Sequence, residues 1–280
     1  MKRSEFSRET VCINSLAVSY KRDLSDTLFQ EVYQHLWGGS HEDEFYRNFF
    51  EADCSLAKVQ VYRHNLKIVG YLIFRVIELE TDGQHFSALR ISTNILPRFQ
   101  GNDLTNFFIF KESIRYWSNH IIPRRKMAVV FAAAGPASYC GFAKRVRRVY
   151  PNPYHDTPRR YDKLMKDVAK KLRFEFEDEG KGTIFFPGRF EKNKKSYVCR
   201  DQKSKELLDF YQKSCPNSGQ GQALLVLSPG EILDAFYAIA FHSHRFLSQH
   251  RLAKKLRLQF DYFLGKGSSH QTLEKVSAKK

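Results

Sequence analysis

The residues from Pro97 to Gly101, between an expected strand and an expected helix, could bind an anion. Residues 87–96 alternate apolar and polar side chains, which is typical of a strand. From Leu104 onwards, apolar residues recur every three or four positions and predict a helix that extends to His120. Its expected apolar face comprises Phe107, Phe110, Ile114, Trp117 and Ile121. The free N–H groups at the start of this helix would follow the carboxyl end of the strand, and such groups attract phosphates and carboxylates.

The same segment resembles a known motif. Residues 95–101, Ile-Leu-Pro-Arg-Phe-Gln-Gly, are similar to V-x-P-x-(Y/F)-(Q/R)-G, which leads into the acyl-coenzyme A pyrophosphate loop of the GCN5-related N-acyltransferases. In that family the loop continues as (Q/R)-x-x-G-x-(G/A), and its two small positions correspond here to Asp103 and Thr105. The resemblance implies an α/β fold with a mixed central sheet flanked by helices. It also implies that a pantetheine arm lies between two parallel strands that splay apart.

The resemblance further implies a set of site residues. A backbone N–H near Asn94 or Ile95 would polarise the thioester carbonyl of acetyl-CoA or a longer acyl-CoA while an amine attacks it. Tyr139 would protonate the departing thiolate, because family members often carry a tyrosine a few residues before a Gly-Phe pair, here Gly141 and Phe142. The N–H groups that would hold the pyrophosphate are those near Gln100, Gly101, Asn102, Asp103, Leu104 and Thr105.

The general base of such a reaction is less clearly marked. Glu78, Glu80 and His85 flank the ends of the expected central strands, and we take Glu80 as the candidate. The alternative for each of them is a solvated surface group, which is the usual role of such side chains. Tyr139 also has a second interpretation, as a buried structural side chain.

Asp103 leaves two interpretations of the loop open. A carboxylate about 5 Å from a phosphate would cost on the order of 3 kcal/mol at an effective dielectric constant of about 20. The loop therefore binds CoA if this side chain turns outward while cations such as Arg98 offset its charge. In the other interpretation, Asn102 or Asp103 caps the helix and the segment binds no ligand.

The charge of the chain points to anionic partners without choosing among them. The 280 residues contain 46 Lys and Arg against 30 Asp and Glu, a formal net charge of +16. Residues 141–215 hold 20 Lys and Arg against 11 Asp and Glu, a net of +9. CoA, nucleic acid and an anionic membrane surface all suit this excess. A second hypothesis is therefore a non-catalytic, degenerate member of the same fold that binds nucleic acid or acidic headgroups through its basic C-terminal half.

Composition predicts a soluble cytoplasmic protein. A hydrophobic content of 42% with 24 Phe indicates a globular chain. Its five cysteines form no C-x-x-C pair, which suits a reducing cytosol. No apolar run approaches the roughly 20 residues that span a bilayer, and the first ten residues are polar and charged. We expect no metal site, because the spacing of His242 and His244 points them to different faces of a helix.

Hydrophobic patterns organise the chain into one domain with two parts. We expect an N-acyltransferase-like core over residues 1–150 and a basic, mainly helical region over 151–280 that completes or flanks it. The first part is predicted to contain strands at 11–20, 56–63, 67–79 and 126–131, and helices at 25–36, 42–51 and from 136. The second is predicted to contain a helix to about residue 172 and a strand at 222–227. Ser228-Pro229-Gly230-Glu231 predicts the start of a last helix that extends to about residue 264.

Overall fold

A computed structural model describes most of the first 230 residues. The described residues are 6–51, 53–101, 104–120, 126–178, 182–185, 189–190, 199 and 201–230. All of them belong to one compact unit, residues 1–235, and the description below concerns this unit. Asn102 and Asp103, and the helix predicted after Gly230 with His242 and His244, lie outside the described residues.

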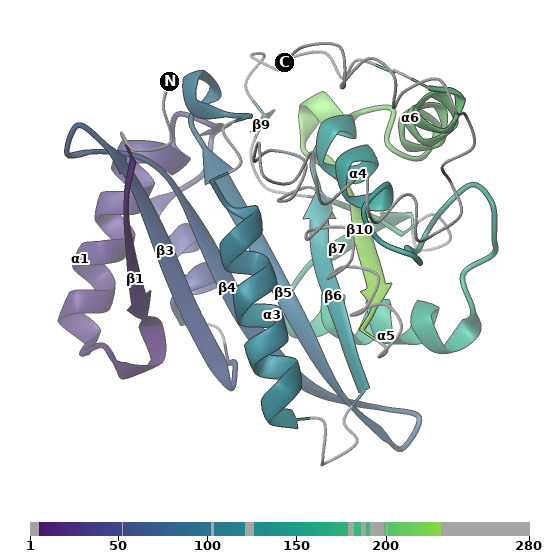
Figure 1. Cartoon of the computed structure of the whole chain (residues 1–280), viewed down its shortest axis with the longest axis horizontal. Helices are drawn as coiled ribbons and strands as arrows, with labels where there is room; N and C mark the ends of the chain where they lie inside the picture. Colours follow the sequence, from purple (N-terminus) through teal and green to yellow (C-terminus); the bar gives the residue numbers. More distant parts are fainter. Residues whose placement is uncertain are drawn as a thin grey trace, which may run out of the picture. The chain divides into compact units, whose positions relative to one another are not determined.

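A mixed eight-stranded sheet forms the centre of the unit (Figure 1). In spatial order its strands are β1 (Phe6–Cys12), β3 (Leu56–His64), β4 (Lys67–Thr81), β5 (Gln84–Ile95), β6 (Lys126–Ala133), β10 (Gln222–Pro229), β8 (Thr183–Phe185) and β7 (Glu175–Asp178). Neighbouring strands are antiparallel except β5 and β6, which are parallel. A separate short pair joins β2 (Trp37–Gly38) to β9 (Arg189–Phe190). The predicted mixed sheet is therefore confirmed.

Tight turns connect the long antiparallel strands. Asn65 and Leu66 have positive φ angles of 50° and 67° between β3 and β4, as a two-residue turn between antiparallel strands requires. Asp82 and Gly83, with φ of 52° and 67°, connect β4 to β5. Residues 68–77 of β4 are buried without interruption because side chains on both faces of the strand meet helices. This continuous burial places β4 at the centre of the core.

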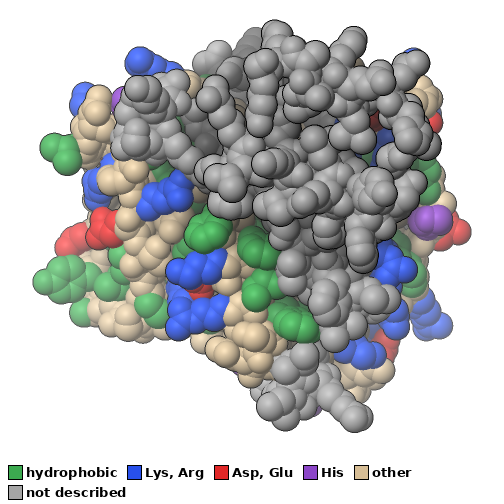
Figure 2. Space-filling view, in the orientation of Figure 1, with side chains coloured by type: hydrophobic (Ala, Val, Ile, Leu, Met, Phe, Trp, Pro, Cys, Tyr) green, Lys and Arg blue, Asp and Glu red, His purple; other side chains and the backbone are tan. Residues whose placement is uncertain are grey.

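Helices cover both faces of the sheet. One face packs against α1 (Val18–Leu28), η3 (Phe29–Tyr33), α2 (Glu42–Phe49) and α5 (Arg159–Lys171). The other packs against α3 (Asn106–His120), α4 (Pro136–Ala143) and α6 (Gln202–Ser214). Short 3-10 turns lie at Ile13–Ser15, Pro97–Phe99 and Ser218–Gln220. We call these two sides the α1/α5 face and the α3/α6 face. Figure 2 views the molecule from the side of α3, where Lys and Arg side chains lie among hydrophobic ones.

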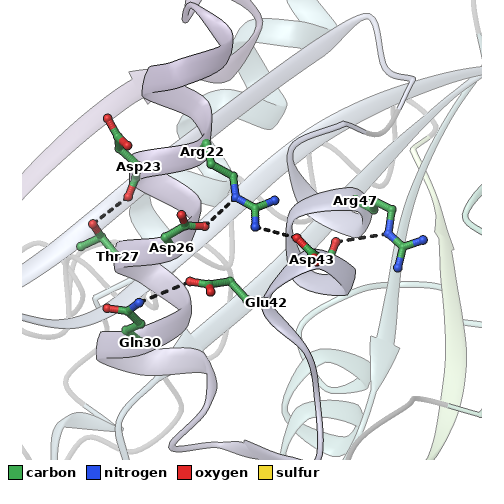
Figure 3. A network of polar contacts seen from close by, with 8 residues as sticks. All are labelled: Arg22, Asp23, Asp26, Thr27, Gln30, Glu42, Asp43 and Arg47. Atoms are coloured by element: carbon green, nitrogen blue, oxygen red, sulfur yellow. Dashed lines mark hydrogen bonds and ion pairs between the residues drawn. The ribbon is translucent and has the colours of Figure 1, made fainter.

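A network of polar contacts joins α1 to α2 (Figure 3). The guanidinium of Arg22 lies 3.1 Å from Asp26 on its own helix and 2.6 Å from Asp43 on α2. Gln30 donates to Glu42 at 3.4 Å. These side chains are exposed or half-buried, so each pair contributes little to stability. Their effect is to fix the two helices side by side over the α1/α5 face, where η3 follows α1.

Four predicted elements differ from the structure. The strand predicted at 11–20 ends at Cys12, and α1 begins at Val18, because exposed apolar residues such as Val18 and Tyr20 imitate strand alternation. The predicted helix start at Ser25 is wrong, since Ser25 lies buried inside α1. The buried face of α3 is rotated about the helix axis from the predicted one, since Phe107 is 60% exposed and Phe108 is buried. Ser228 and Pro229 do not start a helix but belong to β10.

Segments after residue 150 complete the same sheet. The predicted strand at 222–227 is confirmed as β10, which lies between β6 and β8. The predicted basic helix is confirmed as α5, whose buried face follows the helical repeat. Its buried residues are Tyr161, Leu164, Met165, Val168 and Ala169. No helix among the described residues is long and apolar enough to cross a membrane.

Candidate active site

The two parallel strands of the sheet part halfway along their length. β5 and β6 pair from Phe86 opposite Lys126 to Arg90 opposite Val130, and no further. Beyond that point residues 91–95 pair only with β4 and residues 131–133 only with β10. Figure 1 shows the two ribbons adjoining at one end and diverging towards the other. We call the region bounded by Ile91–Ile95 and Phe131–Ala133 the split.

The backbone of Ile95 faces the split. The amide of Leu96 donates to the Val69 carbonyl at 3.0 Å, and Gly70 is the register partner of Ile95. Because hydrogen-bonded pairs alternate along an antiparallel ladder, the N–H and C=O of Ile95 point away from β4. The alternation turns the N–H of Asn94 towards β4 instead. Of the two predicted donors, Ile95 is therefore the one whose amide faces the split.

Asn94 instead contributes a buried side chain. Its amide oxygen accepts a 2.8 Å hydrogen bond from the indole of Trp37, and its amide nitrogen donates to the Tyr71 hydroxyl at 3.0 Å. Burial raises the pKa of Tyr71 well above its ordinary value, so the hydroxyl stays neutral. These bonds fix the end of β5 on the α1/α5 face and thereby fix the orientation of the next residue, Ile95.

The loop after β5 turns back onto that strand. Pro97–Phe99 forms one 3-10 turn, and the side chain of Gln100 donates to the Ile95 carbonyl at 2.9 Å. Gly101 has a φ of +85°, a conformation that a side chain would strain. Leu104 is buried and Thr105 is partly buried at the start of α3. Predicted loop residues 100, 101, 104 and 105 thus lie together at one end of β5.

A cation that the sequence did not reveal lies beside this loop. Arg145, just after α4, donates to the side chain of Asn106 at 3.4 Å, and Asn106 is the first residue of α3. A guanidinium therefore lies at the helix N-terminus where the resemblance implies a pyrophosphate. No spacing rule connects residues 39 positions apart, so only the packing of α4 beside α3 could show this contact.

Tyr139 is buried on the α3/α6 face. It lies in α4, which follows the β6 wall of the split, and its hydroxyl donates to the Pro151 carbonyl at 2.9 Å. Burial raises its pKa above the ordinary range for tyrosine. A neutral hydroxyl with this partner supports the structural interpretation of Tyr139. Its role as the acid stays a prediction that the placement does not favour.

Glu80 lies at the opposite end of the strands. Its register partner is His85, whereas Asn94 is opposite Tyr71, nine residues earlier on β4. At about 3.4 Å per residue, the candidate base is roughly 30 Å from Asn94 and roughly 20 Å from Ile91, where the split begins. Glu78 accepts hydrogen bonds from Tyr116 at 2.7 Å and Ser87 at 3.0 Å. The structure therefore does not bring Glu80 together with Tyr139 or the loop.

The mixed sheet, the parallel strands β5 and β6, the split and the loop before α3 are the features that the resemblance implies. The chain has a GCN5-related N-acyltransferase fold. Within the described residues, no group of three His, Cys, Asp or Glu side chains could hold a metal ion.

Comparisons with known proteins find distant structural similarities. No family model and no curated protein matches the sequence. An aminoglycoside acetyltransferase from an uncultured soil metagenomic sample shares 12% identity over 55% of this chain and 92% of its own, at a TM-score of 0.34. Arabidopsis thaliana Naa50 shares 12% identity over 56% and 93%, at 0.33. The ribosomal-protein-alanine N-acetyltransferase of Brucella melitensis biovar Abortus 2308 shares 11% over 55% and 98%, at 0.32.

Proposed function

We propose that this protein transfers an acyl group from acyl-CoA to an amine. The observation that carries the proposal is the amide of Ile95, which faces the split one residue before the loop that leads to α3. A thioester carbonyl in the split would accept a hydrogen bond from this amide as negative charge develops on its oxygen. The loop and Arg145 would meet the CoA phosphates at the start of α3.

The transfer itself requires few protein side chains. A neutral amine attacks the thioester carbon, the C–N bond forms, and the C–S bond breaks as the oxyanion collapses. One proton leaves the nitrogen and one joins the thiolate, whose ordinary pKa is about 8.5 by analogy with cysteine. We assign neither proton transfer to Glu80, because it lies at the far end of β4. Positioning and the Ile95 amide would supply the main part of the acceleration.

Thermal unfolding in the presence of CoA, acetyl-CoA and longer acyl-CoAs tests binding. A ligand at a hundred times its Kd adds about 2.7 kcal/mol to the stability of the folded state, which corresponds to a rise in Tm of roughly 5 to 10 °C. Release of the free CoA thiol in the presence of a panel of amines then tests turnover. An unchanged Tm with every acyl-CoA would refute the proposal.

Two substitutions localise the ligand. Gly101→Val is expected to weaken CoA binding at least tenfold, since it strains the positive φ of the loop. Gly83→Val is the matched control, because Gly83 also has a positive φ and open surroundings but lies in the β4–β5 turn. Equal affinities for Gly101→Val and Gly83→Val would place the ligand elsewhere.

A third substitution tests the loop carboxylate. Asp103→Gly should strengthen CoA binding if the carboxylate faces the phosphates.

A further inference from the structure

Two buried arginines face each other on the central strands. Arg75 of β4 is the register partner of Arg90 of β5. Their exposed fractions are 1% and 3%. Charged side chains are almost never fully buried unless they are paired, and two like charges opposite each other on antiparallel strands repel. Such a pair requires a compensating negative charge.

The described residues supply no carboxylate to either guanidinium. Arg75 donates to the Asn48 carbonyl at 2.6 Å and lies 5.5 Å from the Phe49 ring. Arg90 lies over the Phe174 ring at 4.5 Å. The Nε of Arg75, and both Nε and Nη1 of Arg90, have no hydrogen-bond partner in the part of the chain that the structure describes. Three buried donors are therefore available for an acceptor.

This environment opposes the charge that both residues carry. Burial lowers the pKa of Arg75 to about 10. Burial, and secondarily the charge of Arg75, lowers the pKa of Arg90 well below its ordinary value. A carboxylate or phosphate between the two guanidiniums would stabilise their charged forms and so raise both pKa values. Its oxygens accept hydrogen bonds from several N–H groups at once, and its charge offsets the repulsion.

The pair lies at the base of the split. Arg90 is the last residue of β5 that pairs with β6. Side chains alternate between faces, so Arg90 shares the α1/α5 face with Ser92 and Asn94. At about 3.4 Å per residue, its Cα lies roughly 14 Å from that of Asn94. An anionic group held at the arginines would therefore lie several bonds away from an amine that attacks beside Ile95.

We propose that Arg75 and Arg90 bind the anionic group, a carboxylate or a phosphate, of the amine that accepts the acyl group. That the ligand is the acyl acceptor rests on the proposed acyl transfer. That it is an anion rests on the two buried arginines. The chemistry it specifies is an amine that also carries a negative charge, such as an amino acid or an amino sugar phosphate.

The test uses the full chain saturated with CoA, so that the loop before α3 is already filled. Tm is measured against increasing sodium phosphate and sodium succinate, with sodium chloride holding the ionic strength constant. The wild-type Tm should rise with at least one of the two anions and saturate. The anion that acts distinguishes phosphate from carboxylate.

Arg90→Met should abolish the saturable rise. In anion-free buffer its Tm should equal or exceed that of the wild type, because it removes a buried charge without a partner. Arg115→Met is the matched control, since Arg115 is exposed on α3. If Arg90→Met does not fold, Arg90→Lys keeps the charge but loses the forked donors and should weaken the anion at least tenfold.

Two results would overturn the inference. One is a wild-type Tm that does not respond to either anion, which would mean that another part of the chain supplies the negative charge. The other is an anion response that Arg90→Met leaves unchanged. The Tm shift that CoA produces in the same samples without anion tests the proposed function separately. If CoA does not raise the Tm of the wild type, acyl transfer is refuted, and the succinate titration still tests the arginine pair.

Discussion

The two walls of the split are supported by different physical means. The end of β5 is held by directional hydrogen bonds, since the buried Asn94 side chain joins Trp37 on one side and Tyr71 on the other. The end of β6 pairs with β10 in the sheet, and its side chains pack in an apolar cluster with β10, α4 and α6. A side-chain hydrogen bond among the described residues of this wall runs from the Tyr211 hydroxyl to the Ala133 carbonyl at 3.0 Å.

This difference matches what each wall would do. Hydrogen bonds fix orientation, and the β5 wall presents the Ile95 amide, which in the proposed reaction points at the thioester carbonyl. Apolar packing fixes position but tolerates small rotations, which is sufficient for a wall that only delimits the space. Substitutions in the β5 support should therefore affect stability and chemistry together, whereas substitutions in the β6 support should affect stability alone.

The largest effect is expected for Asn94→Leu. It leaves the indole N–H of Trp37 buried without its acceptor and removes the bond to Tyr71, which should lower the free energy of unfolding by about 2 to 4 kcal/mol. Urea denaturation measures this change, and CoA-dependent thermal shift should fall with it. Thr93→Leu, at an exposed neighbouring position, is the control and should remain within about 0.5 kcal/mol of the wild type. A loss below 1 kcal/mol for Asn94→Leu would remove the contrast between the walls.

A smaller effect is expected for Tyr211→Phe on the other wall. The Ala133 carbonyl loses one buried hydrogen bond, so the free energy of unfolding should fall by about 0.5 to 1.5 kcal/mol. CoA binding should remain as in the wild type, as measured by thermal shift at saturating ligand. Tyr154→Phe removes an exposed hydroxyl that bonds Glu206 and serves as the comparison. Weaker CoA binding in Tyr211→Phe would show that the β6 wall also orients the ligand.

The smallest effect concerns acid, which should weaken the cap of α6 beside the β6 wall. Asp201 caps α6, and hydrogen bonds from Ser204 and then from Lys144 lower its pKa from 3.8 to about 2. A lowered native pKa means that the stabilisation is complete above pH 4 and is lost as the pH falls towards 2. The Tm difference between wild type and Asp201→Asn, followed from pH 5 to pH 2, should therefore shrink. A constant difference would contradict the assignment.

The sequence predicted β5, its loop and the existence of α3, because strand alternation, the Pro-to-Gly turn and helical spacing are local signals. It did not predict which face of α3 is buried. Glu112 lies in that face and is 4% exposed, since Lys58 of β3 pairs with it at 2.5 Å. A charged residue such as Glu112 inside the buried stripe of α3 obscures the helical repeat of its apolar residues. Its partner, Lys58, lies on β3, so the pair follows from the tertiary packing and not from the local sequence.

The candidate site was predictable only where it follows the backbone. The loop residues are consecutive, and their placement needs nothing beyond a strand, a turn and a helix. Glu80 was chosen because it flanks the end of a predicted strand, and the antiparallel register of β4 and β5 puts that end away from the split. The strand pattern alone does not indicate which end of a strand lies beside the loop. The pair of Arg75 and Arg90 left no signal, since alternation predicts a strand but does not indicate that a cation within it is buried without a carboxylate.

Trp37 gives the split an optical reporter. The chain contains two tryptophans, and the indole of Trp37 is 9% exposed and bonded to Asn94, one residue before the Ile95 amide. Trp117 lies on α3, on the opposite face of the sheet. In a Trp117→Phe background, the emission maximum and lifetime of Trp37 would follow the end of β5 alone. A single excitation wavelength could thus time the arrival of a ligand in the split without any attached dye.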